Sequence, residues 1–319
     1  MRETILGVFE GPLISLLAFA LALTIGFVNH QGGTCTVAAV SDLLDRKPGR
    51  IIALVEAGLW AFAIGMALKL VGSSLPAILD FPVTHATIAG GILLGLGAWL
   101  NKACLFGTLA QLGRRNSNYL FTLAGLLAGF VIHASFFART APVAAPYEPE
   151  RAVMLLAGAL FGLSLLSNLL VAMRTNPLRP GQGLTLGHRE AIIIHSIAFT
   201  VMASIAGPWT YAEILSRYAH SSELPDWFSL ALLLALTFGA LVGGWRTQQS
   251  EPLMVKKAIF CFAGGALMAL GSALVPGGND LLILYGAPLL QWHAVTAIVV
   301  MLCTIASCMT LHRLAAKDH

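Results

Sequence analysis

Residues 85–112 read HATIAGGILLGLGAWLNKACLFGTLAQL, an apolar stretch of helix length, a short polar break and a second, shorter apolar stretch. The first part, residues 85–100, contains no Asp, Glu, Lys or Arg. Its length approaches the about 20 residues with which an α-helix crosses about 30 Å of hydrocarbon. The second part, residues 103–112, is too short to cross. This pattern predicts a membrane helix that leads into a half-helix inside the bilayer.

The composition of the whole chain supports a membrane protein. Of its 319 residues, 57% are hydrophobic and only 11% are charged, against about 25% charged residues in soluble domains. A water-soluble protein is therefore excluded. The net charge of +4 comes from basic residues in short clusters between apolar runs, which indicates membrane topology and excludes a nucleic-acid partner.

The apolar runs predict an all-α integral membrane protein with nine membrane-crossing helices. The expected spans are 12–29, 51–72, 85–100, 119–138, 152–173, 190–206, 227–245, 258–275 and 292–312. Four further apolar segments are too short to cross, and each follows a Gly-, Asn- or Pro-containing break: 33–44, 103–112, 208–217 and 277–286. We expect these four to be re-entrant half-helices.

The basic residues predict the orientation of the chain. On this span assignment, thirteen Lys and Arg lie on one side: Arg46, Lys47, Arg50, Arg114, Arg115, Arg174, Arg179, Arg189, Arg246, Lys256, Lys257, Arg313 and Lys317. Four lie on the other side, Arg2, Arg139, Arg151 and Arg217, and Lys69 and Lys102 fall within or beside spans. Because Lys and Arg concentrate on the cytoplasmic side, we expect an external N-terminus and a cytoplasmic C-terminus.

A glycine pattern predicts an internal repeat. Gly90-Gly91, Gly97 and Leu100 of the third span recur 174 residues later as Gly264-Gly265, Gly271 and Leu274 of the eighth. A single extra crossing at 152–173 separates a first half, 12–138, from a second, 188–312, so the second half enters the membrane from the opposite side. The two halves would be inverted repeats whose broken helices meet near the midplane and build a binding site. Taken singly, each glycine also fits a close helix-packing position.

Two cysteines occupy related contexts in the first half. Cys35 lies in Gly32-Gly33-Thr34-Cys35-Thr36, and Cys104 lies in Asn101-Lys102-Ala103-Cys104-Leu105-Phe106-Gly107-Thr108. Each would sit at or near the N-terminus of a half-helix, where free N–H groups and the positive end of the helix dipole favour an anion. A soft, polarizable thiol suits a sulfur-bearing ligand. Buried cysteines otherwise mostly pack, which is our interpretation of Cys261, Cys303 and Cys308.

Several charged and polar residues inside the spans are weaker candidates. Lys102, beside a membrane break, is costly unless it faces a cavity, an ion-pair partner or an anionic substrate. Lys69 fits a snorkelling side chain, and Glu56 fits either a functional role or an ion pair with a basic loop residue. Three histidines either relay protons or are satisfied polar residues between helices: His133, His195 and His293.

No enzymatic motif competes with transport. The sequence contains no GxxxxGK[ST] P-loop, no GxGxxG, no HExxH and no GxSxG, and its five cysteines lack metal-site spacing. We therefore expect neither an enzyme nor a bound cofactor or metal.

Three groups of motifs together resemble the YeeE/YedE sulfur-transport family of bacterial inner-membrane proteins. The first runs from Gly26-Phe27 through Gly32-Gly33-Thr34-Cys35-Thr36-Val37 to Asp42-Leu43. The second runs from Gly95-Leu96-Gly97 through Asn101, Ala103-Cys104 and Gly107-Thr108-Leu109 to Leu112-Gly113. The third comprises Gly264-Gly265, Gly271, Gly277-Gly278-Asn279-Asp280, Gly286 and Pro288-Leu289-Leu290.

The resemblance implies an hourglass of nine spans and short inward-pointing helices that takes up thiosulfate through hydrogen bonds to pore-lining thiols. Cys35 and Cys104 match two family cysteines, whereas the Gly-Gly-Cys type motif of the third reads Gly277-Gly278-Asn279 here. We therefore expect the substrate to meet Gly33, Thr34, Cys35, Thr36, Asn101, Lys102, Cys104, Gly107, Gly277, Gly278 and Asn279. The implied partners are a sulfur anion, membrane lipid and a cytoplasmic sulfur-handling protein.

Two other functions remain open at this point. Cys35 and Cys104 would also suit a membrane-embedded thiol protein that relays sulfane sulfur or forms a redox pair. Alternatively, the basic loops would suit a non-transporting scaffold for a cytoplasmic partner.

Overall fold

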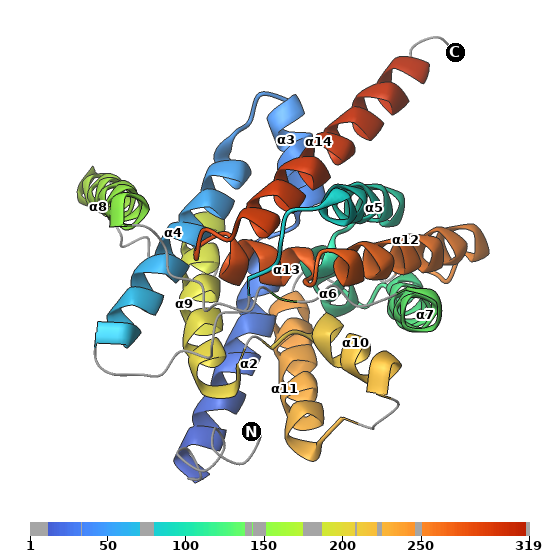
Figure 1. Cartoon of the computed structure of the whole chain (residues 1–319), viewed down its shortest axis with the longest axis horizontal. Helices are drawn as coiled ribbons and strands as arrows, with labels where there is room; N and C mark the ends of the chain where they lie inside the picture. Colours follow the sequence, from blue (N-terminus) through green and yellow to red (C-terminus); the bar gives the residue numbers. More distant parts are fainter. Residues whose placement is uncertain are drawn as a thin grey trace.

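The computed structural model describes residues 12–32, 34–70, 80–137, 142, 151–174, 187–207, 209–221, 225–245 and 251–316 (Figure 1). These residues form helices joined by short connections, with no β-strand among them. The expected all-α fold class is confirmed.

Within these ranges, long helices fall on the nine predicted spans, with ends that differ by only a few residues. They are α2 (Pro12–Gly32), α4 (Gly49–Leu70), α5 (His85–Asn101), α7 (Leu120–Phe136), α8 (Arg151–Arg174), α9 (His188–Ala206), α11 (Trp227–Gly244), α12 (Val255–Leu274) and α14 (Trp292–Ala315). Eight stretches of the described residues are long and apolar enough to cross a membrane, and α8 adds a shorter apolar run at Met154–Ser167. The chain is therefore a multi-pass membrane protein.

Short helices occupy the four segments that the sequence marked as too short to cross. They are α3 (Thr36–Leu44), α6 (Leu105–Gly113), α10 (Tyr211–Ser221) and α13 (Asn279–Leu281), and the last continues into the π-helical η3 (Leu282–Gly286). Each follows a long helix after a break, at residues 33–35, 102–104, 207–210 and 275–278. A short 3₁₀ turn, η1 (Ser117–Tyr119), connects α6 to α7.

The fourth short segment is less regular than the sequence suggested. After one α-helical turn, the N–H of Ala287 donates to the carbonyl of Leu282 over 2.7 Å, and the N–H of Gln291 donates to that of Gly286 over 3.1 Å. Both bonds span five residues, which widens the helix. Pro288, which has no N–H, lies between the two donors, so the narrower α-helical ladder cannot continue there.

The antiparallel contact of α5 and α12 lies at the centre of the fold and depends on glycine. A Cβ added at Gly97 would lie 2.6 Å from the carbonyl oxygen of Gly264, and one at Gly90 would lie 2.8 Å from that of Gly271. Because any side chain at these positions would meet backbone atoms, only glycine permits this approach. Small residues are the usual means of helix association in a membrane, where water provides no driving force.

The helix pairs follow the 174-residue offset found in the sequence. Adding 174 to the residue numbers of Gly90 and Gly97 gives Gly264 and Gly271. The contact of Gly90 with Gly271 therefore corresponds, under this shift, to the contact of Gly97 with Gly264. The contacts between whole helices follow the same offset. The contact of α5 with α14 corresponds to that of α12 with α7, and the contact of α2 with α11 corresponds to that of α9 with α4. The helix contacts are thus symmetric about the 174-residue offset.

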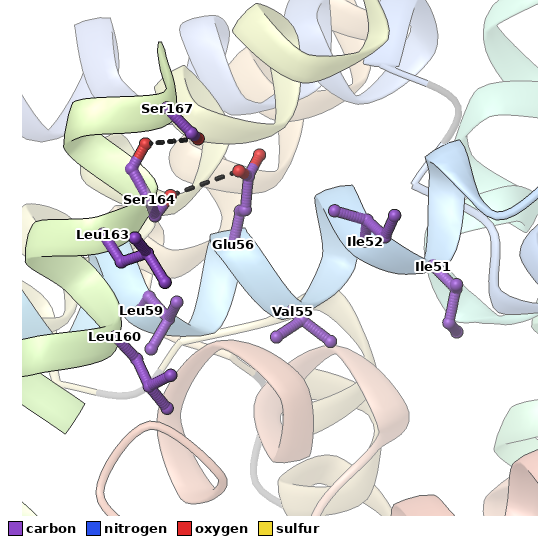
Figure 2. Close-up of a pocket in the computed structure, with 9 residues that line it drawn as sticks. All are labelled: Ile51, Ile52, Val55, Glu56, Leu59, Leu160, Leu163, Ser164 and Ser167. Carbon is purple, nitrogen blue, oxygen red and sulfur yellow. Dashed lines mark hydrogen bonds between the residues drawn. The ribbon is translucent and has the colours of Figure 1, made fainter. Parts of the chain in front are cut away.

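The additional helix α8 stands at one edge of the molecule and packs on α4 (Figure 1). Figure 2 shows the cleft of about 420 Å³ between them, lined by apolar side chains apart from Glu56, Ser164 and Ser167. The Ser164 hydroxyl donates to Glu56 over 3.1 Å, and Arg189 of α9 pairs with the same carboxylate. Glu56 therefore belongs to a structural ion pair that joins α4, α8 and α9.

We expect Gly97→Ala to destabilise the protein because its methyl group would press on the Gly264 carbonyl. Overpacking of this kind costs about 1–3 kcal/mol. The matched control is Gly162→Ala on α8, where an added Cβ meets nothing within 4 Å and where alanine favours the helix by about 0.5–1 kcal/mol. Unfolding of both variants in detergent is the measurement. Equal stability of the two variants would show that the α5–α12 contact does not need glycine.

Candidate functional site

The site begins where α3 and α6 start. Cys35 is the residue before α3 and Cys104 is the residue before α6, and both have extended backbone conformations. The first turn of a helix has N–H groups without intrahelical partners. The N–H of Thr36 donates to the sulfur of Cys104 over 3.3 Å. The start of α3 is thus directed at the thiol of α6.

The two thiols contact each other. Cys35 and Cys104 form a side-chain hydrogen bond, and both are free cysteines. Gly107 allows this contact, since a Cβ added there would lie 2.7 Å from the Cys35 sulfur and 3.0 Å from the Ala103 Cβ. Cys104 has no exposed surface, and Thr36 is 1% exposed. Cys104 is therefore sealed from solvent in this conformation, whereas Cys35 keeps some exposed surface.

Side chains from both halves of the chain hold the first turn of α6. The Asn29 amide donates to the Phe106 carbonyl over 2.9 Å, and the Thr34 hydroxyl donates to Asn29. From the second half, the Tyr211 hydroxyl donates to the Leu105 carbonyl over 2.8 Å. These bonds fix the backbone that carries Cys104.

Asn279 contributes the other contact from the second half. Its Oδ1 accepts the Leu105 N–H over 3.1 Å. Its Nδ2 is buried and has no hydrogen-bond partner in the described part of the chain. A buried amide donor without a partner costs free energy, which a ligand able to accept the hydrogen bond would recover.

The side chain of Asn101 forms its hydrogen bonds with protein groups and leaves none for a ligand. Its amide donates to the Ala103 carbonyl over 2.7 Å and to the Thr108 hydroxyl over 3.0 Å, and its Oδ1 accepts from Thr122 over 2.7 Å. It therefore stabilises the break between α5 and α6. Sequence reasoning placed Asn101 among the substrate contacts, and the structure fills its hydrogen-bonding capacity with protein.

Lys102 has an exposed side chain and ends α5 in the left-handed conformation, with φ of 57°. It lies within electrostatic range of Glu251 and Cys261. The ammonium therefore belongs to a charged region near the loop before α12. Lys69 is the other lysine expected within a span, and its side chain lies outside the described residues. Gly33 lies wholly outside them.

Gly278 stands before α13 as Cys104 stands before α6, 174 residues earlier. A Cβ at Gly278 would lie 2.5 Å from both Leu105 Cδ1 and Asp280 Oδ1. A cysteine at this position would require the ends of the Leu105 and Asp280 side chains to move. The same shift takes Cys35 to Trp209, so the thiol pair has no equivalent in the second half.

A third cysteine, Cys261, lies near Cys35. The sequence predicts only a packing role for it. Cys261 forms a small buried cluster with Ala103 and Tyr119, and Cys35 packs against this cluster as well as against Cys104. Cys261 lies on α12, in the second half, and no spacing in the sequence links it to Cys35. Cys303 is exposed and Cys308 is partly buried.

A basic group lies next to the Cys261 cluster. The Lys257 ammonium lies 5.6 Å from the centre of the Tyr119 ring and pairs with Glu251. The hydrogen bond from Lys257 lowers the pKa of the Glu251 carboxyl, which stays ionised near neutral pH. Lys102, Lys257 and Glu251 thus form a charged cluster near Cys261.

The three histidines differ in their surroundings. His133 lies 3.3 Å from His220 between ring nitrogens, and His293 lies 3.2 Å from Asp80. His195 is 2% exposed, and both of its ring nitrogens lack partners among the described residues. It borders a small apolar-walled cavity with Thr34 and Phe106. The first two therefore have polar contacts, and His195 is the histidine that faces internal space.

With the geometry described, the comparison with known families identifies the segment that carries the thiols. Residues 31–180 match the sulphur transport family. The match includes Cys35, Cys104 and their two short helices and confirms, over that segment, the YeeE/YedE resemblance. No curated protein matches this chain. In the described residues no three His, Cys, Asp or Glu side chains group in a way that would hold a metal ion.

We expect Gly107→Ala to separate the two thiols, because its methyl group would occupy the space of the Cys35 sulfur. Mild oxidation of the wild type with copper phenanthroline should yield a Cys35–Cys104 disulfide, and the variant should yield several-fold less. Gly58→Ala is the matched control, since its added Cβ meets its nearest neighbours only at 3.8 Å. Mass spectrometry of tryptic fragments measures the yield. An unchanged yield in Gly107→Ala would contradict the contact.

Proposed function

We propose that this protein carries thiosulfate, or a closely related small sulfur anion, across the bacterial inner membrane into the cytoplasm. The observation that carries the proposal is the contact of Cys35 and Cys104 at the starts of two broken helices. The sulphur transport family of this segment supports the substrate class. The apolar helices support a route across the bilayer.

The chemistry of the site suits such an anion. Thiosulfate presents oxygen atoms that accept hydrogen bonds and a terminal sulfur that is large and polarizable. Thiols donate weakly and offer soft sulfur contacts. The Thr36 N–H and the Asn279 amide add stronger donors beside them. The site thus binds through short-lived hydrogen bonds without a fixed cation, which favours release as well as entry.

The route continues from Cys35 to Cys261 and then to the charged cluster of Lys102, Lys257 and Glu251. We propose that this cluster faces the cytoplasm, because it belongs to the side that holds thirteen of the assigned basic residues. The N-terminus is then periplasmic and the C-terminus cytoplasmic. Lysine side chains at the exit attract an anion that has left the thiols.

The two halves, 12–138 and 188–312, act in this proposal as inverted repeats around α8. Their broken helices supply opposite sides of the constriction: Cys35 and Cys104 from the first half, Asn279 and Tyr211 from the second. Because Cys104 is sealed, passage of an anion along both thiols requires a second conformation in which the halves move relative to each other. Rocking of inverted repeats about a central site is a common means of alternating access.

We expect a Cys35→Ala, Cys104→Ala double variant to lose at least about tenfold in thiosulfate uptake, equivalent to about 1.4 kcal/mol of lost interaction. Cys261→Ala should lose less, because it stands later on the route. Cys303→Ala, which removes an exposed thiol, should transport normally. Uptake of labelled thiosulfate into proteoliposomes containing only this protein is the measurement. Wild-type rates in the double variant would rule out the thiol route.

We further expect Asn279→Asp to lower thiosulfate affinity by about tenfold or more. The aspartate keeps an oxygen for the Leu105 N–H, so the start of α6 stays in place. It removes the buried amide donor that the anion would contact. Calorimetric binding on purified protein is the measurement, and the unfolding temperature without ligand serves as the control for folding. Full affinity in this variant would remove Asn279 from the site.

A second function is favoured by the same thiol contact, a membrane-embedded relay of sulfane sulfur. In that case Cys35 or Cys104 would carry a persulfide during turnover. Trapping with an alkylating reagent and mass spectrometry distinguishes the two functions. A carrier keeps both thiols unmodified while the labelled anion crosses intact.

A further inference from the structure

Asp280 is a buried acid that the proposed anion site leaves unused. It is the second residue of α13, directly after Asn279, and is 3% exposed. Its Oδ1 accepts the N–H of Leu281 over 2.9 Å. In the described residues no Lys, Arg or His lies within ion-pair distance of it, whereas the other buried carboxylate, Glu56, has Arg189.

The groups that face Asp280 offer no positive charge. Cys104 faces it from the start of α6, and Tyr211 and Glu213 face it from α10. The titratable group of the adjoining η3 is Tyr285. An ionised carboxylate in such surroundings is strongly disfavoured, so the group neutralises by binding a proton. Intramembrane acids in this situation mark proton and ion pathways in transport proteins.

The position of Asp280 links its proton to the anion. Cys104 interacts electrostatically with Asp280 and lies in the proposed site. An anion held by Cys104 and Asn279 would be repelled by an ionised Asp280 and tolerated by a protonated one. Since such coupling is reciprocal, the anion in turn strengthens proton binding at Asp280.

We propose that Asp280 is the site of a co-transported proton, so that the protein carries a sulfur anion and a proton together. This inference rests on the proposed function, and it supplies what anion uptake into a negative interior requires. The proton cancels one negative charge of the cargo during the crossing. When the site opens to the cytoplasm, hydration of Asp280 favours the ionised form, and the proton and the anion both leave.

The main test is uptake of labelled thiosulfate into proteoliposomes with an imposed pH difference, acidic outside. For one proton per anion, each unit of pH difference should raise wild-type accumulation by about tenfold. Asp280→Asn mimics the protonated acid, so it should exchange thiosulfate without responding to the gradient. Asp226→Asn, which makes the same change at an exposed carboxylate before α11, is the matched control and should respond as the wild type does. A gradient response in Asp280→Asn equal to that of the wild type would overturn the inference.

A second measurement keeps the inference separate from the proposed function. Infrared spectra of the purified wild type at neutral pH should contain the carbonyl stretch of a protonated, buried carboxylic acid. Labelling aspartate with carbon-13 should shift this band, which separates Asp280 from Glu56. A missing or unshifted band would overturn the proton site even if thiosulfate is carried. If the wild type takes up no thiosulfate under any condition, the proposed function fails, and the band still decides whether Asp280 holds a proton.

Discussion

The hydrogen bond from the Leu105 N–H to the Asn279 side chain joins residues 174 positions apart at the point where α6 begins. A backbone N–H without a partner is costly in hydrocarbon, because no water can satisfy it. The first turn of α6 is nevertheless broken away from α5, and its N–H groups face inward. Asn279 satisfies one of them from 174 residues away. Without the second half, the first half would have a helix start that the bilayer does not tolerate.

The close approach of α5 and α12 makes that bond geometrically available. Where Gly97 meets Gly264 and Gly90 meets Gly271, the two backbones come into contact, so the short helices that follow α5 and α12 converge. In a membrane this contact depends on dispersion and shape rather than on exclusion of water. The glycines therefore determine where α6 and α13 begin, and through them where Cys104 and Asn279 lie.

The site that results is asymmetric although the scaffold repeats. The first half contributes the thiols, and the second half contributes an amide, a tyrosine hydroxyl and a buried acid. At the positions equivalent to Cys35 and Cys104 the second half has Trp209 and Gly278. Two repeats can thus share the same helix packing and differ at the breaks. In the proposed site the first half supplies the thiol donors, and the second half supplies the buried acid that binds a proton.

The sequence by itself determined the fold class, the helix positions and the breaks, because each depends on local properties. Hydrophobic length defines a membrane helix, and Gly, Asn and Pro interrupt it whatever the rest of the chain does. The short apolar segments that follow these breaks also predicted that Cys35 and Cys104 would lie at the starts of short helices, as they do. The sequence did not predict the π-helical segment at Leu282–Gly286. That segment depends on which carbonyls accept the backbone N–H groups on either side of Pro288.

Tertiary structure decided which of the candidate residues meet. The sequence treated Asn101 and Lys102 as neighbours of the substrate, yet packing gives Asn101 three protein partners and leaves Lys102 exposed. It treated Cys261 as a packing residue, and the fold does pack it with Ala103 and Tyr119 in a cluster that Cys35 also contacts. Nothing in the local sequence indicates that Asn279 forms a hydrogen bond with Leu105. Nothing in it indicates that Asp280 has no cation nearby in the described residues. Contacts between residues 174 positions apart depend on how closely helices approach, and only the packed structure contains that information.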